Sequence, residues 1–295
     1  MQKNPRHLAI ILFILLAVTW GSSFILMKRG LVTFTPIQIG AIRIAYASIF
    51  TAIIGFKTFK YFRLKDLGPL AVVGWLGNGL PYIFFPLAVS KVDSSIVGIT
   101  NSLVPLFTLL VGLVWFKTKP TLLQYLGIFF GLLGAIYLIK PETGFTVDEN
   151  VGYLGFSIVA TLFYGISINT IKSKLQHLNS LAITNLSLLT VGPGMIILLF
   201  FTDFTARFSN PYAWSSMGYL AILGILGSSF AVIGFNYLIK ISTPIFSSSV
   251  TYAVPIVAIC WGFIDGEVIG LKHFVGVGFI LLGIYLVNLK RKKSG

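Results

Sequence analysis

The strongest constraint on this chain is a succession of ten apolar runs, each about long enough to cross a bilayer as a helix. Only short connections separate the runs, and 10% of all residues are charged, at a mean hydropathy of +0.91. A soluble domain carries about 25% charged residues. We therefore predict an all-α integral membrane protein with ten transmembrane helices. The runs are residues 8–27, 36–56, 67–89, 94–115, 121–139, 151–171, 181–202, 215–239, 245–263 and 269–289.

The basic residues predict the orientation of the chain. With the N-terminus in the cytoplasm, 15 of the 22 Lys and Arg residues fall in cytoplasmic segments, 6 fall in external loops, and Arg43 lies within a run. Because positive residues are enriched on the cytoplasmic side, both termini are predicted to be cytoplasmic. The net charge of +14 does not indicate a nucleic-acid partner, since the bases are spread over separate short loops rather than one polar face.

The chain also repeats itself. Residues 1–144 and 145–295 are predicted to be two homologous repeats of five helices each. Because five is odd, the repeats would cross the membrane in opposite senses, an arrangement that recurs in transporters and supports alternating access. Segments 20–28 and 164–172 each start with an aromatic residue and Gly, and each has a lysine eight residues after the aromatic. Segments 74–79 and 224–229 share two glycines. Segments 91–105 and 240–255 each begin with Lys and end with Val-Pro.

Several short motifs stand at defined positions in the runs. They are Trp20-Gly21-Ser22-Ser23-Phe24 with Lys28, Pro36 with Arg43, the Ser/Thr-rich entries to Pro105 and Pro255, and Gly266-Glu267 followed by Gly276 and Gly283. In this order the chain resembles the EamA-type ten-helix transporters of the drug/metabolite transporter superfamily. The resemblance implies a central cavity lined mainly by helices one, three, four, six, eight and nine. It also implies movement of small metabolites, most often amino acids, across the cytoplasmic (inner) membrane of a bacterium by a multi-pass protein.

Polar and aromatic residues inside the runs are the candidates for substrate contact. Buried amides in lipid need partners, so Asn78, Asn101 and Asn169 either hold helices together or contact substrate. For Asn236, near the end of its run, a role in holding helices is favoured. An aromatic lining would suit a partly apolar metabolite. The predicted substrate-binding residues are Trp20, Asn78, Tyr82, Asn101, Tyr164, Asn169 and Tyr252.

Five further residues are predicted to have structural or gating roles. Gly21 lets another helix approach closely, and Pro105 and Pro255 free backbone carbonyls at hinges or binding positions. Lys28 is expected to reach the outer interface, or to attract an anionic group there. Arg43 is costly in a span without an acidic partner. It is expected to brace the helix through hydroxyls, carbonyls, headgroups or water, with contact to a substrate carboxylate as the alternative.

The sequence contains no Walker-type phosphate loop, no H-E-x-x-H motif and no paired-acid motif. We therefore expect no catalytic residue, no metal and no cofactor. The favoured function is a secondary transporter that exports amino acids or related compounds, with the bilayer and a small-molecule substrate as its partners, acting as a monomer or homodimer. The alternative is a membrane-embedded enzyme acting on a lipid-linked substrate, which would need a cluster of acids or histidines at one interface.

Overall fold

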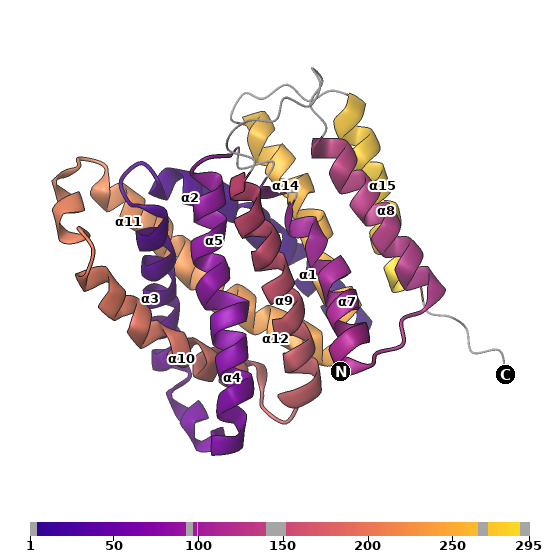
Figure 1. The fold of residues 1–295 in the computed structure, drawn as a ribbon, viewed down its shortest axis with the longest axis horizontal. Helices are drawn as coiled ribbons and strands as arrows, with labels where there is room; N and C mark the ends of the chain where they lie inside the picture. Colours follow the sequence, from indigo (N-terminus) through magenta and orange to yellow (C-terminus); the bar gives the residue numbers. More distant parts are fainter. Residues whose placement is uncertain (1–4, 93–96, 99, 140–151, 265–270, 290–295) are drawn as a thin grey trace.

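The computed structural model describes residues 5–92, 97–98, 100–139, 152–264 and 271–289, and the regular elements in these ranges are all helical (Figure 1). Within them, six helical segments are long and apolar enough to cross a membrane, and four more apolar helices are shorter. Each of these segments falls on one of the ten apolar runs, so the predicted all-α membrane fold is confirmed. The boundary expected between residues 144 and 145, and the Gly266-Glu267 motif, lie outside the described residues.

The described elements follow the order of the runs. The first half contains α1 (Pro5–Gly21), α2 (Ser23–Gly30), α3 (Pro36–Ile54), η1 (Phe56–Tyr61), η2 (Leu64–Asp66), α4 (Leu67–Gly74), η3 (Trp75–Gly79), α5 (Leu80–Val89), η4 (Asn101–Leu103), α7 (Val104–Phe116) and α8 (Leu122–Ile139). The second half contains α9 (Leu154–Lys174), α10 (Ser180–Phe200), η6 (Thr205–Ser209), α11 (Ala213–Ile222), η7 (Leu223–Phe230), α12 (Ala231–Ile241), α13 (Pro244–Ser248), α14 (Val250–Ile264) and α15 (Leu271–Asn288).

Local sequence signals set where several helices begin. Thr35 caps α3 by accepting a hydrogen bond from the Gln38 backbone N–H, while the Gln38 side chain accepts one from the Thr35 backbone N–H. Pro36 follows at the first helical position, where its missing N–H costs nothing. Asn179 caps α10 in a similar way through the backbone N–H of Ala182. These caps satisfy backbone donors that the first turn of a helix leaves unpaired.

The two halves are interleaved rather than separate. Helix α3 packs against α10, α7 against α9, α1 against α14, and α5 against α9, so each of these pairs joins the first half to the second. The pair α8 and α15 stands side by side at one edge of the molecule (Figure 1). The largest core cluster also draws residues from both halves. The interior of each half is therefore completed by the other.

Polar contacts fasten α3 and α10 to each other near both of their ends. At one end, Gln38 Nε2 donates to Asp203 Oδ1 at 2.8 Å. At the other, Asn185 Nδ2 donates to Thr58 Oγ1 at 2.9 Å and to the Gly55 carbonyl at 3.1 Å. Side-chain bonds to partners in the other half replace water, which is absent in lipid. The α3–α10 pair is thus fastened near both ends.

Two helices widen into π-helical turns at matching positions of the repeats. These turns are η3 in the third span and η7 in the eighth. In each, a side chain reaches back five residues to a carbonyl at 3.2 Å: Asn78 Nδ2 to Val73, and Ser228 Oγ to Leu223. The extra residue in a π turn leaves carbonyls less well paired, and such turns are frequent at functional sites. Gly77 and Asn78 of η3 line the central cavity described below, and η7 forms hydrogen bonds with two residues that line it, Trp20 and Arg43.

Glycines allow the backbones of α8 and α15 to touch. A methyl group added at Gly283 would lie 2.6 Å from the Gly127 carbonyl oxygen and 2.6 Å from the Gly131 nitrogen. One added at Gly134 would lie 2.6 Å from the Gly276 carbonyl oxygen. Small residues that let two backbones approach are a common basis for helix association in membranes. The glycines singled out in the sequence motif, Gly276 and Gly283, therefore serve this crossing.

Lys172 caps the C-terminal end of α12. Its Nζ donates to the carbonyl oxygens of Ile239 at 2.9 Å, Lys240 at 3.2 Å and Ser242 at 2.6 Å. The last carbonyls of a helix have no partners within it, and a cation there also complements the helix dipole. The matching Lys28 is exposed on α2. The two lysines thus occupy equivalent positions in the repeats but lie in different surroundings.

We expect Gly283→Ala to lower the free energy of unfolding by about 1–3 kcal/mol, because the added methyl must push α15 away from α8. Thermal melting of the purified protein in detergent measures this. The matched control is Gly278→Ala on the same helix, where no atom lies within 4 Å and the change removes only backbone freedom. Equal melting temperatures for the two variants would contradict the tight crossing.

We expect Lys172→Met to lower the free energy of unfolding by about 1–3 kcal/mol, since three carbonyls at the end of α12 lose their donor. The control is Lys174→Met, two residues along α9, where the side chain is exposed. Both changes remove one positive charge from the same helix end. If the control melts at the same lowered temperature, charge rather than capping explains the effect.

Candidate functional site

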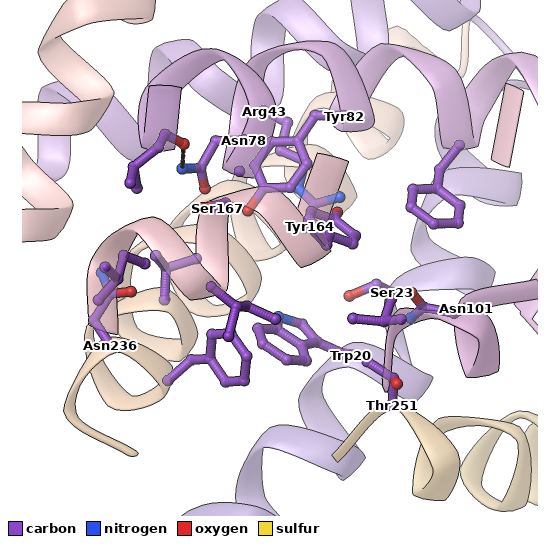
Figure 2. A pocket seen from close by; sticks show the side chains of 18 of the residues that line it. Trp20, Ser23, Arg43, Asn78, Tyr82, Asn101, Tyr164, Ser167, Asn236 and Thr251 are labelled. Carbon is purple, nitrogen blue, oxygen red and sulfur yellow. Dashed lines mark hydrogen bonds between the residues drawn. The ribbon is translucent and has the colours of Figure 1, made fainter. Parts of the chain in front are cut away.

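A central cavity of about 770 Å³, measured with its opening, lies between the two halves. Its walls come from the helices of spans one, three, four, six, eight and nine, together with Arg43 of α3. The six spans are those that the family resemblance implies. Figure 2 shows Trp20, Tyr82 and Tyr164 facing the same space from three different helices. The interleaved packing of the halves therefore produces an internal chamber to which both contribute.

The lining is paired by the repeat. Two sequence spacings relate the halves: the one from Trp20 to Tyr164 and the one from Pro105 to Pro255. Each of these spacings connects cavity residues of the first half to cavity residues of the second. A cavity on the pseudo-two-fold axis of two repeats has this property. The pairs whose members both line it are Trp20 and Tyr164, Ser23 and Ser167, Phe24 and Ile168, Met27 and Ile171, Tyr82 and Val232, Phe85 and Phe235, and Asn101 and Thr251.

Two aromatic contacts make this relation explicit. The Trp20 ring meets Phe235 edge-on, with 4.9 Å between centroids, and the Tyr164 ring stacks on Phe85 at 5.9 Å. Each contact joins the first span of one half to the third span of the other. Trp20 is also fixed by its Nε1, which donates to the Gly227 carbonyl in η7 at 3.1 Å. The two contacts give the cavity an aromatic wall on each side.

Amides and hydroxyls supply the polar groups of the lining. The side chains of Asn78 and Asn101 are buried, and the Oδ1 atom of each has no hydrogen-bond partner among the described residues. Asn78 commits its Nδ2 to the Val73 carbonyl, as Figure 2 shows, so its remaining capacity is as an acceptor. A buried acceptor without a partner carries a cost. A bound ligand with an N–H or O–H group could remove that cost.

Arg43 is the charged residue of the lining. It is 5% exposed, its Nε donates to Ser228 Oγ at 2.6 Å, and its guanidinium carbon lies 3.6 Å from the centroid of the Tyr82 ring. The hydroxyl partner agrees with what the sequence requires, since the runs offer no central acid. The ring face of Tyr82 provides a further electrostatic contact. Arg43 thus bonds to a π turn of the other half, and its side chain also reaches the cavity wall.

Five of the seven residues proposed for substrate contact line the cavity, and two do not. Asn169 donates through Nδ2 to the carbonyls of Thr108 and Gly165, both at 2.9 Å, and so holds α9 to α7. Tyr252 is fully buried against Gly131, and its hydroxyl donates to the Ile128 carbonyl at 3.3 Å. Both side chains therefore have structural partners. The residues that line the cavity are Trp20, Asn78, Tyr82, Asn101 and Tyr164.

The remaining singled-out residues lie apart from the cavity. A methyl group added at Gly21 would lie 3.1 Å from the Val254 carbonyl oxygen, so this glycine lets α1 cross α14 closely. Lys28 is exposed. Pro105 is buried near the start of α7, and Pro255 is buried within α14. Two prolines at equivalent repeat positions thus stand at different points along their helices.

Sequence reasoning missed several lining residues. For Asn236 a role in holding helices was favoured, and its Nδ2 does donate to Thr184 Oγ1 at 2.8 Å, but the residue also lines the cavity. Thr251 and Ser167 were not singled out, although they are the repeat partners of Asn101 and Ser23. Mapping each candidate onto the other half would have found both. No comparable signal marks Phe85 among 26 phenylalanines.

Comparison with known proteins agrees with this architecture. Residues 7–140 and 151–289 each match the model of the EamA-like transporter family. A protein of Archaeoglobus fulgidus named an uncharacterized transporter is 26% identical, covering 95% of this chain and 99% of its own. Another, of Escherichia coli K12, is named the inner membrane transporter YedA; it is 25% identical, covering 93% of this chain and 88% of its own.

A solved crystal structure has the same fold. It matches with a TM-score of 0.74 at 13% sequence identity, and the match covers 95% of this chain and 96% of the other. At this identity the likeness concerns the fold alone. The family matches extend over most of the chain, and the relatives that match nearly end to end are named as transporters. This multi-pass membrane protein therefore belongs to the EamA-like transporter family.

Proposed function

We propose that the protein is a secondary transporter that moves small metabolites by alternating access, and that amino acids or related compounds are its substrates. The observation that carries this proposal is a central cavity whose lining residues are paired between the two repeats. Inverted repeats around a shared site support alternating access, because exchanging the conformations of the two halves exchanges the two openings. The transporter family of the chain supports the same function.

The reciprocal aromatic contacts support this mechanism in physical terms. Trp20 with Phe235 and Tyr164 with Phe85 are equivalent contacts on the two sides of the cavity. Their ring separations and angles differ, so the structure is not symmetric in this conformation. If the halves exchange conformations, each contact takes the geometry of the other. Two states built from the same kinds of contact can be close in free energy, which a transport cycle requires.

The composition of the lining supports a substrate with both polar and apolar parts. Aromatic rings can cover an apolar side chain, and the unpartnered Oδ1 atoms of Asn78 and Asn101 can accept hydrogen bonds from an ammonium group. The cavity lining, as far as the structure describes it, includes no Asp, Glu, His or Cys. We therefore propose transport without catalysis.

We further propose that the chain resides in the cytoplasmic membrane of a bacterium with both termini inside, as a monomer or homodimer. The excess of Lys and Arg in one set of loops supports this orientation. The relative named as an inner membrane transporter supports the compartment. Cysteine substitutions in the terminal segments and loops, probed with an impermeant maleimide on intact cells, would establish the orientation.

The decisive experiment is counterflow in proteoliposomes preloaded with unlabelled amino acids, followed with each labelled amino acid in turn. We expect at least one to accumulate. We expect Trp20→Ala and Asn101→Ala to reduce that accumulation by about tenfold, equivalent to losing about 1.4 kcal/mol of interaction each. The matched control is Trp115→Ala, because Trp115 is an exposed tryptophan of α7 away from the cavity.

Two outcomes would contradict the proposal. If no amino acid accumulates although the reconstituted protein melts cooperatively, amino acids are not the substrate class. If Trp20→Ala and Trp115→Ala retain equal activity, the cavity wall at Trp20 takes no part in transport.

A further inference from the structure

Among the residues that the structure describes, the cavity carries one positive charge and no negative one. Of its lining residues, Arg43 alone is charged, and its side chain is nine-tenths or more buried. Its polar contacts within the described ranges are the Ser228 hydroxyl and the face of the Tyr82 ring, neither of which carries a negative charge. The hydrogen bond to Ser228 uses Nε, one of five N–H donors in a guanidinium group. A buried charge without a counter-ion is expensive in lipid, and such residues mark functional sites.

The fold itself does not require an arginine at this position. A methyl group added at Gly224 would lie 2.9 Å from the Arg43 carbonyl oxygen, where η7 packs against α3. The equivalent contact in the other half joins Gly74 to the Ser187 carbonyl oxygen. Ser187 is thus the repeat partner of Arg43, at the spacing that relates Trp20 to Tyr164. Since Ser187 is fully buried and uncharged, the same packing forms without a charge.

The surroundings of Arg43 also orient it. Ser228 fixes the guanidinium from the π-turn side, and Tyr82 covers the guanidinium carbon at 3.6 Å. In Figure 2, Arg43 lies behind Tyr82 and close to Tyr164 at the cavity wall. A planar guanidinium held by one edge can still present its other N–H groups as a pair, the geometry that matches a carboxylate. Aromatic rings beside it would cover the apolar part of the same ligand.

We propose that Arg43 is the carboxylate-binding and charge-selecting residue of this cavity, so that the transported molecule is a small monocarboxylate with an apolar body. This inference rests on the proposed transport function and names the charge of its substrate. A single guanidinium balances a single negative charge, and no second cation lines the cavity among the described residues. A doubly charged phosphate would leave one charge unbalanced, which favours a carboxylate.

The test compares ligands that differ only in the charged group. The purified protein is melted in detergent at neutral pH with 3-phenylpropionate, L-phenylalanine, L-phenylalaninamide and phenethylamine, each up to about 10 mM, because a ligand that binds the folded state raises the melting temperature. We expect the two carboxylates to raise the melting temperature and the amide and amine to leave it unchanged. In Arg43→Gln the rise should disappear, and in Arg43→Lys it should persist but be smaller, since lysine lacks the paired donors.

The control variant is Arg63→Gln, which removes an exposed arginine and the same charge. It should respond to the carboxylates like the wild type. If Arg43 had only a structural role, Arg43→Gln would have a lower melting temperature without ligand, and carboxylates would still raise that temperature as they do in the wild type. If Arg43→Gln does not fold, the comparison of Arg43→Lys with wild type decides, because both keep the charge.

The other outcomes separate this inference from the transport function. If the amide or amine stabilises the wild type as well as the acids do, or if no carboxylate stabilises it, the inference is overturned. Transport of an amine that is unaffected by Arg43→Gln would support the transport function and contradict the carboxylate site. If carboxylates bind in a manner that depends on Arg43 but none of them is transported in proteoliposomes, the result would support the site and contradict the transport function.

Discussion

The contact on which this structure depends is the crossing between the third span of each half and the second span of the other. Gly74 meets the backbone at Ser187, and Gly224 meets the backbone at Arg43, so the absence of a glycine side chain lets each pair of helices approach closely. Lipid offers no hydrophobic reason for helices to associate, and such close packing replaces it. Gly74 directly precedes one π turn, and Gly224 lies within the other. The crossing therefore joins the halves and places two π turns, of which one lines the cavity and the other bonds to lining residues.

This packing of two related halves produces a cavity in which some repeat-related positions hold similar residues and others do not. Trp20 and Tyr164, or Ser23 and Ser167, are pairs of similar residues, whereas Arg43 is paired with Ser187 and Tyr82 with Val232. In the proposed transport cycle, the similar pairs keep the two conformations close in free energy. The dissimilar pairs hold the substrate in one orientation while the openings exchange. A fully symmetric lining would bind a polar substrate in two opposite orientations with equal affinity.

The sequence predicted most of the fold because lipid leaves few alternatives. Apolar runs of spanning length must be helices, and all ten appear as helices in the described residues. The site was predicted less well because residue type does not reveal direction. Asn101 and Asn169 are both amides in apolar runs, yet one lines the cavity and the other bonds to α7. Tyr252 faces Gly131, a contact that depends on how α8 and α14 pack and that no local pattern encodes.

The repeat separates the residues that build the fold from those that give it a function. Where both members of a pair make the same kind of contact, as Gly74 and Gly224 do, packing alone explains the residue. In other pairs, one half has a buried charged side chain and the other half forms the same backbone contact with an uncharged one. Packing of the backbones then does not explain why the charge is there. Arg43 is such a residue, because Ser187 occupies its place in the other half. A buried charge is costly in lipid, and in the proposed transport cycle the bound substrate would supply the opposite charge.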